Sequence, residues 1–342
     1  MKSLWRAARA SGRAIPVAIA LAVAGSALAW HPRAAAAASL PTLGTLVWSD
    51  DFNGQAGAPP DTTKWNVATG YWNAASQQLE CYTNSPDNVR LDGHGHLSIT
   101  ALYAPGTQCG GSTLNYTSGR IDTNQKFSVQ YGTIQIRMRM PTAQGMWPAF
   151  WSVGVNTAQV GDPNGGEIDA VEAIGSDSGT SKVYGTLHGP DAGDPGYWSS
   201  GGTVIASSDL SQWHTYAISW QPGQISFLLD GLVYYTATSS SLPANDEWVF
   251  DSQPFYLILN LAVGGTWPGD PDASTTFPQL MNVAWVRVYS LPQSSPPSPA
   301  VSSPSPSPAA SSPSQSSSLS PSPSPSSPAP SDSQSAPPSP SP

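Results

Sequence analysis

Apolar and polar residues alternate along several short runs of this chain, which is the pattern of a β-strand with one buried face. Gly132–Met140 has the sequence GTIQIRMRM, in which apolar residues occupy every second position. Successive side chains of a strand point to opposite faces, so this run predicts a strand with an apolar inner face. Helical periodicity is hard to find in the same part of the chain, which favours an all-β structure.

Further runs predict strands and the turns between them. Tyr216–Trp220 and Ile225–Leu229 flank a Gln-Pro-Gly turn and predict a hairpin, which Leu232–Thr236 continues after an Asp-Gly turn. Phe255–Val263 is a long apolar run typical of a strand buried on both faces, and Val283–Tyr289 predicts a final strand. Turn residues recur at intervals of about 8–12 positions, as in a two-sheet sandwich or jelly roll in which a curved sheet can form a groove.

The two ends of the chain differ from its centre in composition. Residues 1–38 combine a basic head, an apolar stretch of about 16 residues and a run of small residues, which predicts a secretory signal peptide. A membrane anchor is the alternative, but the apolar stretch is short for a span of about 20 residues. Residues 291–342 contain 17 prolines, 23 serines and one charged residue, too little apolar surface to fold. They predict a disordered spacer, or a remnant linker without a role, and leave one domain at residues 40–290.

Charge and cysteine content exclude several classes of protein. The formal net charge is −9, and removing the five basic residues of the predicted leader changes it to −14. Such an acidic chain repels nucleic acid and other polyanions, so a neutral polymer suits it better. Two cysteines, Cys81 and Cys109, are too few for a four-cysteine zinc site. In an exported protein they predict a disulfide, with two free buried thiols as the alternative.

Three carboxylates lie within six residues at Glu167–Glu172, where the sequence is EIDAVE. Glu167 and Asp169 share one face of a strand, whereas regular alternation would place Val171 rather than Glu172 beside them. A one-residue β-bulge between Asp169 and Glu172 would bring all three acids into one cleft. Crowded carboxylates separate in pKa, which glycoside hydrolysis uses to keep one ionised and another protonated. The alternative is an ordinary exposed strand whose polar face is acidic.

The same segment resembles the E-x-D-x-x-E signature of glycoside hydrolase family 16, in the bulged form of its laminarinase-like members (endo-β-1,3-glucanases). Segments that resemble the family follow in family order: Leu46–Asn53, Tyr116–Ile121, Trp147–Trp151, Gly185–His188, Trp213–Trp220 and Phe255–Pro268. The resemblance implies that residues 40–290 are a catalytic domain, a concanavalin A-like β-jelly roll with a sugar-binding cleft on its concave face. It also implies a retaining double displacement in which Glu167 is the nucleophile, Glu172 the general acid/base and Asp169 the assisting carboxylate.

Six other residues are candidates for contact with sugar. They are Trp147, Trp151, Trp267, His188, Arg120 and Asn260. A flat indole can stack on the apolar face of a pyranose, and the resemblance implies cleft positions for these tryptophans, the histidine and the asparagine. Core packing is the alternative for the tryptophans, a structural hydrogen bond for the histidine and an ion pair for the arginine. Four tryptophans in strand-like runs are expected in the core: Trp48, Trp65, Trp220 and Trp285.

Two departures from the family bear on substrate and metal. Where members often have Asn-Glu-Leu-Gln on the glycone side, this chain has Gln-Leu-Glu-Cys at Gln78–Cys81, which leaves the sugar contacts there open. The last strand has Ala284 where many relatives have an aspartate that helps to bind calcium, although Asp50 and Asp51 could contribute ligands. We therefore expect no required cofactor and no metal in the site, with a structural calcium ion as a weakly supported alternative.

These features favour a secreted endo-glycosidase that hydrolyses internal β-1,3 linkages of a glucan. Alternatives within the family are a galactan or agar hydrolase and a transglycosylase. An alternative from another class is a non-catalytic glucan-binding lectin, which has no need of paired carboxylates. The expected partner is a polysaccharide, with no nucleic acid and no membrane after signal cleavage, and the expected form is an extracellular monomer.

Overall fold

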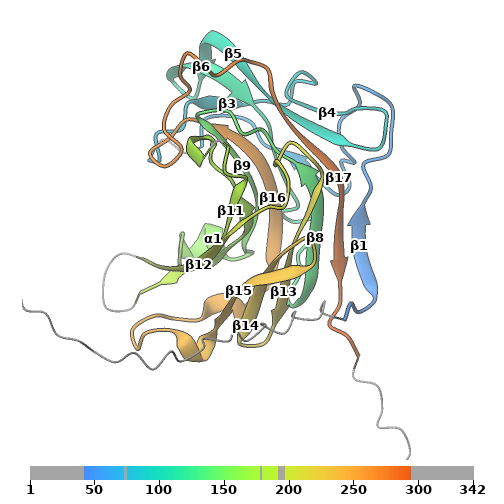
Figure 1. The fold of residues 1–342 in the computed structure, drawn as a ribbon, viewed down its shortest axis with the longest axis vertical. Coiled ribbons are helices and arrows are strands. Elements are labelled where there is room, and N and C mark those ends of the chain that lie inside the picture. The colour runs from blue at the N-terminus through green and yellow to red at the C-terminus, as the bar shows by residue number, and fades with distance from the viewer. Residues whose placement is uncertain (1–41, 73–74, 178, 192–196, 294–342) are drawn as a thin grey trace, which may run out of the picture. The chain divides into compact units, whose positions relative to one another are not determined.

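The structure is a computed structural model that describes residues 42–72, 75–177, 179–191 and 197–293. In this part of the chain the strands form two sheets, and long curved strands of both run beside each other (Figure 1). The architecture confirms the predicted all-β jelly-roll sandwich. The predicted signal peptide at 1–38 lies outside the described residues, as does the predicted tail from residue 294 onward.

The larger sheet has ten strands among the described residues, in the order β15-β14-β13-β8-β17-β5-β6-β3, with β1 paired to β17 and β4 paired to β5. Its strands are β1 (Leu46–Asp50), β3 (Glu80–Tyr82), β4 (Val89–Leu91), β5 (Leu97–Cys109), β6 (Ser112–Ser118), β8 (Gly132–Arg139), β13 (His214–Gln221), β14 (Gln224–Leu229), β15 (Leu232–Thr238) and β17 (Gln279–Tyr289).

The smaller sheet has seven strands in the described ranges, in the order β12-β11-β10-β9-β16-β7-β2. They are β2 (Asn66–Val67), β7 (Arg120–Asp122), β9 (Met146–Gly154), β10 (Glu167–Glu172), β11 (Lys182–Pro190), β12 (Tyr197–Ile205) and β16 (Phe255–Val263). The helical segments are α1 (Thr157–Val160) and the 3-10 turns η1 (Gly175–Asp177), η2 (Ser239–Ser241) and η3 (Val249–Asp251). None of the described helices is long and apolar enough to cross a membrane.

The strands predicted from alternation are present. The GTIQIRMRM run forms β8, with Ile134 and Ile136 buried in the core. The predicted hairpin forms β13 and β14, in which Tyr216 lies opposite Leu229. The long apolar run forms β16, which is buried along almost its whole length, as expected for a strand covered on both faces.

The tryptophans expected in the core divide into two groups. Trp65 and Trp220 are fully buried, and Trp48 packs against the edge of the core. The expectation for Trp285 is wrong, because this ring is only half-buried and Arg287 stacks on it at 4.5 Å from the ring centroid. The register of β17 against β8 shifts between Val283 and Trp285, which breaks the alternation on which the expectation rested.

The core lies between the two sheets. Trp220 of β13 and Phe255 of β16 meet edge to face, with ring centroids 5.2 Å apart. Near the candidate site the sheets approach so closely that a Cβ atom at Gly185 of β11 would lie 2.4 Å from the ring of Phe227 on β14. A glycine is therefore required where β11 passes over the larger sheet.

Cys81 and Cys109 form a disulfide, with Cα atoms 5.9 Å apart. The bridge joins β3 to the end of β5 and closes a loop of 28 positions. On the loop-entropy argument, a loop of this length stabilises the fold by about 3–4 kcal/mol.

Glu80, beside this disulfide, links the two sheets. Its carboxylate accepts a hydrogen bond from the backbone N–H of Val263 on β16 at 2.7 Å, and the carbonyl of Val263 accepts from the N–H of Leu79. Glu80 is only 1% exposed, and burial raises the pKa of its carboxyl to about 7 from an ordinary value of 4.5, against the opposing effect of these hydrogen bonds. The carboxyl group of Glu80 therefore accepts the hydrogen bond that a backbone carbonyl of a neighbouring strand would otherwise accept from the end of β16.

Stability should fall with rising pH because of Glu80. Its raised pKa means that the folded protein binds this proton more tightly than the unfolded chain, so the free energy of unfolding decreases between about pH 4.5 and pH 7 and then levels off. The loss attributable to this residue is about 3 kcal/mol. Glu80→Gln should remove this loss. In urea unfolding, the free energy of unfolding should therefore fall further between pH 5 and pH 8 in the wild type than in the variant. An equal change in the free energy of unfolding between the two pH values in wild type and variant would contradict the assignment.

Candidate active site

Glu167, Asp169 and Glu172 lie together on β10, in the middle of the smaller sheet. Against β11, the register passes from Asp169 opposite Thr186 to Glu172 opposite Tyr184, so β10 carries one extra residue at this point. This shift confirms the predicted β-bulge. All three carboxylates line one cleft of about 200 Å³. The other residues lining it are Ser76, Gln78, Trp147, Ala149, Trp151, Asp162 and Asn260.

The apolar residues of the bulged strand face the other way. Ile168 and Val171 are 0% exposed and belong to the core between the sheets. The bulge therefore does two things, because it returns Glu172 to the cleft face and keeps Val171 in the core. Burial of the apolar face therefore holds β10 in place, while the opposite face carries three neighbouring carboxyl groups.

Burial and mutual repulsion dominate the electrostatics of the cluster. Loss of water raises the pKa of all three carboxyls, and this effect is the largest at each of them. The charge of Asp169 further raises the pKa of Glu167, and the charge of Glu172 does the same for Asp169. His188 opposes the rise in the pKa of both glutamates. The cluster thus holds protons more tightly than three separate surface carboxyls would.

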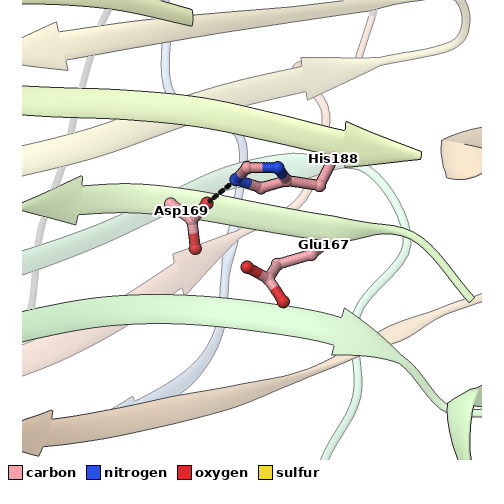
Figure 2. Close-up of side chains that lie close together, drawn as sticks. All are labelled: Glu167, Asp169 and His188. Carbon is pink, nitrogen blue, oxygen red and sulfur yellow. Dashed lines mark ion pairs between the residues drawn. The ribbon is translucent and has the colours of Figure 1, made fainter. Parts of the chain in front are cut away.

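Asp169 is the most enclosed of the three, at 4% exposure, and contacts two neighbours. Its interaction with the carboxyl group of Glu167 opposes the rise in the pKa of Asp169, as expected for two neighbouring carboxyl groups that can share a proton. Its Oδ2 atom lies 3.1 Å from Nε2 of His188, which projects from the neighbouring strand β11 (Figure 2). That pair is close enough for charge attraction but lacks the alignment of a hydrogen bond.

Glu172 is held by Trp147. The indole N–H donates to Oε1 of Glu172 at 2.8 Å, and this bond opposes the rise in the pKa of Glu172 that burial causes. Trp267 packs edge-on against Trp147 at 5.4 Å between centroids, and against Tyr184 at 4.8 Å. Trp267 is 38% exposed, so it lies at the surface beside Trp147.

Trp151 lies directly opposite Asp169 on the neighbouring strand β9. Its indole N–H donates to Oδ1 of Asn260 at 2.7 Å. The guanidinium of Arg120 lies 4.8 Å from the centroid of Trp151 and 5.0 Å from that of Trp72, so the cation is sandwiched between two indoles. Arg120 is buried and has no ion pair among the described residues, so it does not take the alternative role of a structural ion pair.

The structure thus brings all six candidate sugar-contacting residues into one region, some in the lining of the cleft and others behind it or beside it. Trp147, Trp151 and Asn260 line the cleft, whereas His188, Arg120 and Trp267 contact residues that line it.

Several cleft residues escaped the sequence analysis. Asp162 and Ser76 lie in loops without a distinctive motif. Gln78 belongs to the segment noted as a departure from the family, and that departure was the available signal. Trp72, 54% exposed, had no signal in its sequence context, because its role depends on Arg120, which lies far along the chain.

A cation would find ligands at one place in the described part of the chain. Glu167, Asp169 and His188 each offer one ligand atom, and these atoms lie within 4.8 Å of one another. The same three groups are also suited to proton sharing, which needs no metal. Acid–base chemistry accounts for the burial and the hydrogen bonds of this cluster.

Comparison with known proteins identifies the family. The sequence profile described as Glycosyl hydrolases family 16 matches residues 75–287. Glucan endo-1,3-beta-glucosidase A1 of Niallia circulans is 36% identical over 268 residues, covering 71% of this chain and 37% of the relative. Beta-glucanase of Rhodothermus marinus is 36% identical over 255 residues, covering 71% of this chain and 84% of the relative.

A solved structure agrees in fold. The laminarinase catalytic domain of Thermotoga maritima superposes with a TM-score of 0.65 at 36% identity, covering 73% of this chain and 99% of that domain. The region matched by the family profile, residues 75–287, contains the strands that carry the carboxylate cleft. The chain spans 37% of the length of the Niallia circulans relative. Since the family profile extends over most of the described residues, the chain belongs to glycosyl hydrolases family 16.

Proposed function

We propose that this protein is an endo-glycosidase that hydrolyses internal β-1,3 linkages of a glucan. The observation that carries the proposal is the grouping of Glu167, Asp169 and Glu172 in one cleft of about 200 Å³. The relatives reported above, whose names include a glucan endo-1,3-beta-glucosidase and a laminarinase, support the linkage and the polymer.

The first chemical step is attack by Glu167 on the anomeric carbon. Attack requires an ionised Glu167, so at this step we assign the proton of the pair to Asp169, the more enclosed of the two carboxyl groups. The attack forms a covalent glycosyl-enzyme, and the sugar on the other side of the bond leaves. Asp169 thus assists by keeping the proton away from the nucleophile and by orienting its carboxylate.

Glu172 provides the proton that the leaving sugar needs. Burial raises the pKa of this carboxyl, which favours the protonated form that an acid requires. After the first sugar has left, the ionised Glu172 removes a proton from water, and the resulting hydroxide equivalent releases Glu167 from the intermediate with retention of configuration. The N–H of Trp147 holds the carboxyl in place through both steps.

Sugar binding is assigned to the aromatic and amide groups around the carboxylates. Trp147 and Trp267 form a wall beside Glu172, and Trp151, backed by Arg120, forms a second wall beside Asp169. Asn260 and His188 supply polar contacts between these walls. Arg120 covers one face of Trp151, so a sugar ring would meet the opposite face or the edge of the indole.

A neutral glucan suits the charge of the chain better than a sulfated galactan, which an acidic protein repels. A galactan hydrolase or a transglycosylase would use the same carboxylates and remains the second candidate. A glucan-binding lectin is disfavoured, because burying three carboxylates side by side costs stability that binding alone does not require. The features of residues 1–38 support secretion, and a monomer is the proposed working form.

We also propose that the reaction needs no cofactor and that the residues considered for calcium serve other contacts. Asp50 accepts hydrogen bonds from the indole of Trp65 and the N–H of Phe52, and its neighbour Asp51 pairs with Arg287. Carboxylates engaged in this way are poor calcium ligands, because binding the ion would require breaking these contacts.

Replacing either glutamate should abolish turnover while leaving the fold intact. Glu172→Gln removes the acid and should reduce kcat on laminarin by about 10²–10⁴-fold, and Glu167→Gln removes the nucleophile and should cost at least as much. Glu247→Gln is the matched control, since this glutamate is exposed. Reducing-end release measures activity and circular dichroism checks folding. Near-normal turnover by either cleft variant would end the assignment.

A substrate panel tests the linkage and the polymer. Incubation with laminarin, lichenan, agarose and carrageenan should release reducing ends from laminarin, with chain shortening that begins at internal bonds. Release from agarose or carrageenan alone would replace the glucan proposal with the galactan alternative, and binding to laminarin without release would favour the lectin.

Removal of divalent metal should leave the protein unchanged. Excess EDTA is expected to alter neither the Tm nor the rate on laminarin, because Asp50 and Asp51 already have protein partners. A drop in Tm that calcium restores would show a structural calcium site elsewhere in the fold.

A further inference from the structure

Trp151 is restrained more firmly than an aromatic wall of a cleft needs to be. It lies opposite Asp169 in the ladder between β9 and β10. Its indole N–H is 2.7 Å from Oδ1 of Asn260, and Arg120 covers one face of the ring. These two contacts define both the tilt and the rotation of the indole.

The hydrogen bond from Trp151 is the first of a chain. Asn260 donates from Nδ2 to the hydroxyl oxygen of Tyr82 at 3.1 Å. The hydroxyl of Tyr82 in turn interacts with the carboxyl group of Glu80, which adds to the rise in the pKa of the tyrosine that burial causes and opposes the rise in the pKa of the glutamate. Both hydrogen bonds run in the same direction, from the indole toward Tyr82. Bonds aligned in this way strengthen one another.

The indole at the start determines that direction. An indole N–H only donates, so the amide of Asn260 presents its oxygen to Trp151 and its NH₂ group to the hydroxyl oxygen of Tyr82. The hydroxyl proton of Tyr82 is then left for Glu80, whose carboxyl group offers an acceptor oxygen whether it is ionised or protonated. Without that acceptor the hydroxyl could turn its proton toward Asn260, and the amide would have to reverse and present N–H groups to the indole N–H, which repels them.

Glu80 and Tyr82 are each 1% exposed, so neither can touch a sugar. Asn260 and Trp151 line the cleft. The hydrogen bonds from Tyr82 through Asn260 to Trp151 therefore connect the buried pair to the cleft.

We propose that Glu80 is a positioning residue, which through Tyr82 and Asn260 holds Trp151 in the orientation that a sugar ring meets. The proposal rests on the proposed function, because a bound sugar is what makes the orientation of Trp151 matter. The chain ends at residues that do not exchange protons with the glycosidic bond. It therefore acts on substrate affinity rather than on the chemical step.

Tyr82→Phe is the sharpest test, because it removes one oxygen atom and leaves the ring packing in place. With soluble β-1,3-gluco-oligosaccharides, KM should rise about 5- to 10-fold, the equivalent of one hydrogen bond. The value of kcat should stay within about twofold. Tyr216→Phe is the matched control, since Tyr216 is also 1% exposed and its hydroxyl has no hydrogen-bond partner among the described residues. An unchanged KM in Tyr82→Phe, or an equal rise in the control, overturns the proposal.

The role of Glu80 itself is tested by two substitutions of similar size. Glu80→Gln retains an acceptor oxygen for Tyr82 and should keep KM near the wild-type value, whereas Glu80→Leu lacks it and should match Tyr82→Phe. Combining Glu80→Leu with Tyr82→Phe should add nothing further to KM. Equal KM values for the Gln and Leu variants contradict the proposal, and if Glu80→Leu does not fold, Tyr82→Phe and Glu80→Gln still decide it.

A measurement without substrate separates this proposal from the proposed function. The indole N–H signal of Trp151 in a ¹H–¹⁵N NMR spectrum, assigned by its loss in Trp151→Phe, should move in Tyr82→Phe and stay in place in Tyr216→Phe. A signal that does not move in Tyr82→Phe overturns the chain whatever the substrate is. A signal that moves in a protein that leaves laminarin intact assigns the failure to the proposed function alone.

Discussion

The site depends on the burial of three like charges on one strand. Carboxylates removed from water repel one another strongly, and a fold that places them together must compensate by sharing protons and supplying donors. Asp169 and Glu167 are placed to share a proton, and Trp147 donates a hydrogen bond to Glu172. His188, on the adjacent strand, adds the nearest basic group. Each of these partners therefore offsets part of the free-energy cost of burying the carboxyl groups.

The β-sandwich can carry this cluster because the opposite face of β10 is fully apolar. Ile168 and Val171 are completely buried, and the bulge keeps both in the core while Glu172 turns to the cleft. A strand exposed on both faces would have no such anchorage, and repulsion between the acids would distort it. The close approach of the sheets at Gly185 restrains the neighbouring strand as well, because it leaves no room for β11 to move toward the larger sheet.

The features that follow from neighbouring residues were predictable from the sequence. Alternation in β8, the hairpin of β13 and β14, and the bulge at Glu172 are all properties of short segments, and the structure contains each of them. Trp285 shows the limit of this reasoning, since β17 has an extra residue relative to β8 between Val283 and Trp285, and this shift changes which residues are covered.

Contacts between distant segments were not predictable in this way. Asn260 and Tyr82 are 178 positions apart, and Trp151 and Asn260 are 109 apart, so no local pattern links them. The sandwich of Arg120 between Trp72 and Trp151 likewise forms only when β7 and β9 are placed on either side of β16. Sequence patterns indicate which residues carry chemistry, whereas the strand order decides which residues orient them.

Glu80 in the larger sheet and Glu172 in the smaller sheet show how one fold uses buried glutamates for two purposes. Each is almost fully enclosed, each accepts a hydrogen bond from an N–H group, and burial raises the pKa of both. They differ in what lies beyond the carboxyl group: a solvent-connected cleft beside Glu172, and the backbone of β16 and Tyr82 beside Glu80. A carboxyl group that faces the cleft can exchange its proton with a substrate, whereas one enclosed by donors can only orient them. The surroundings of each glutamate, rather than the residue type, therefore distinguish the proposed acid from the proposed positioning residue.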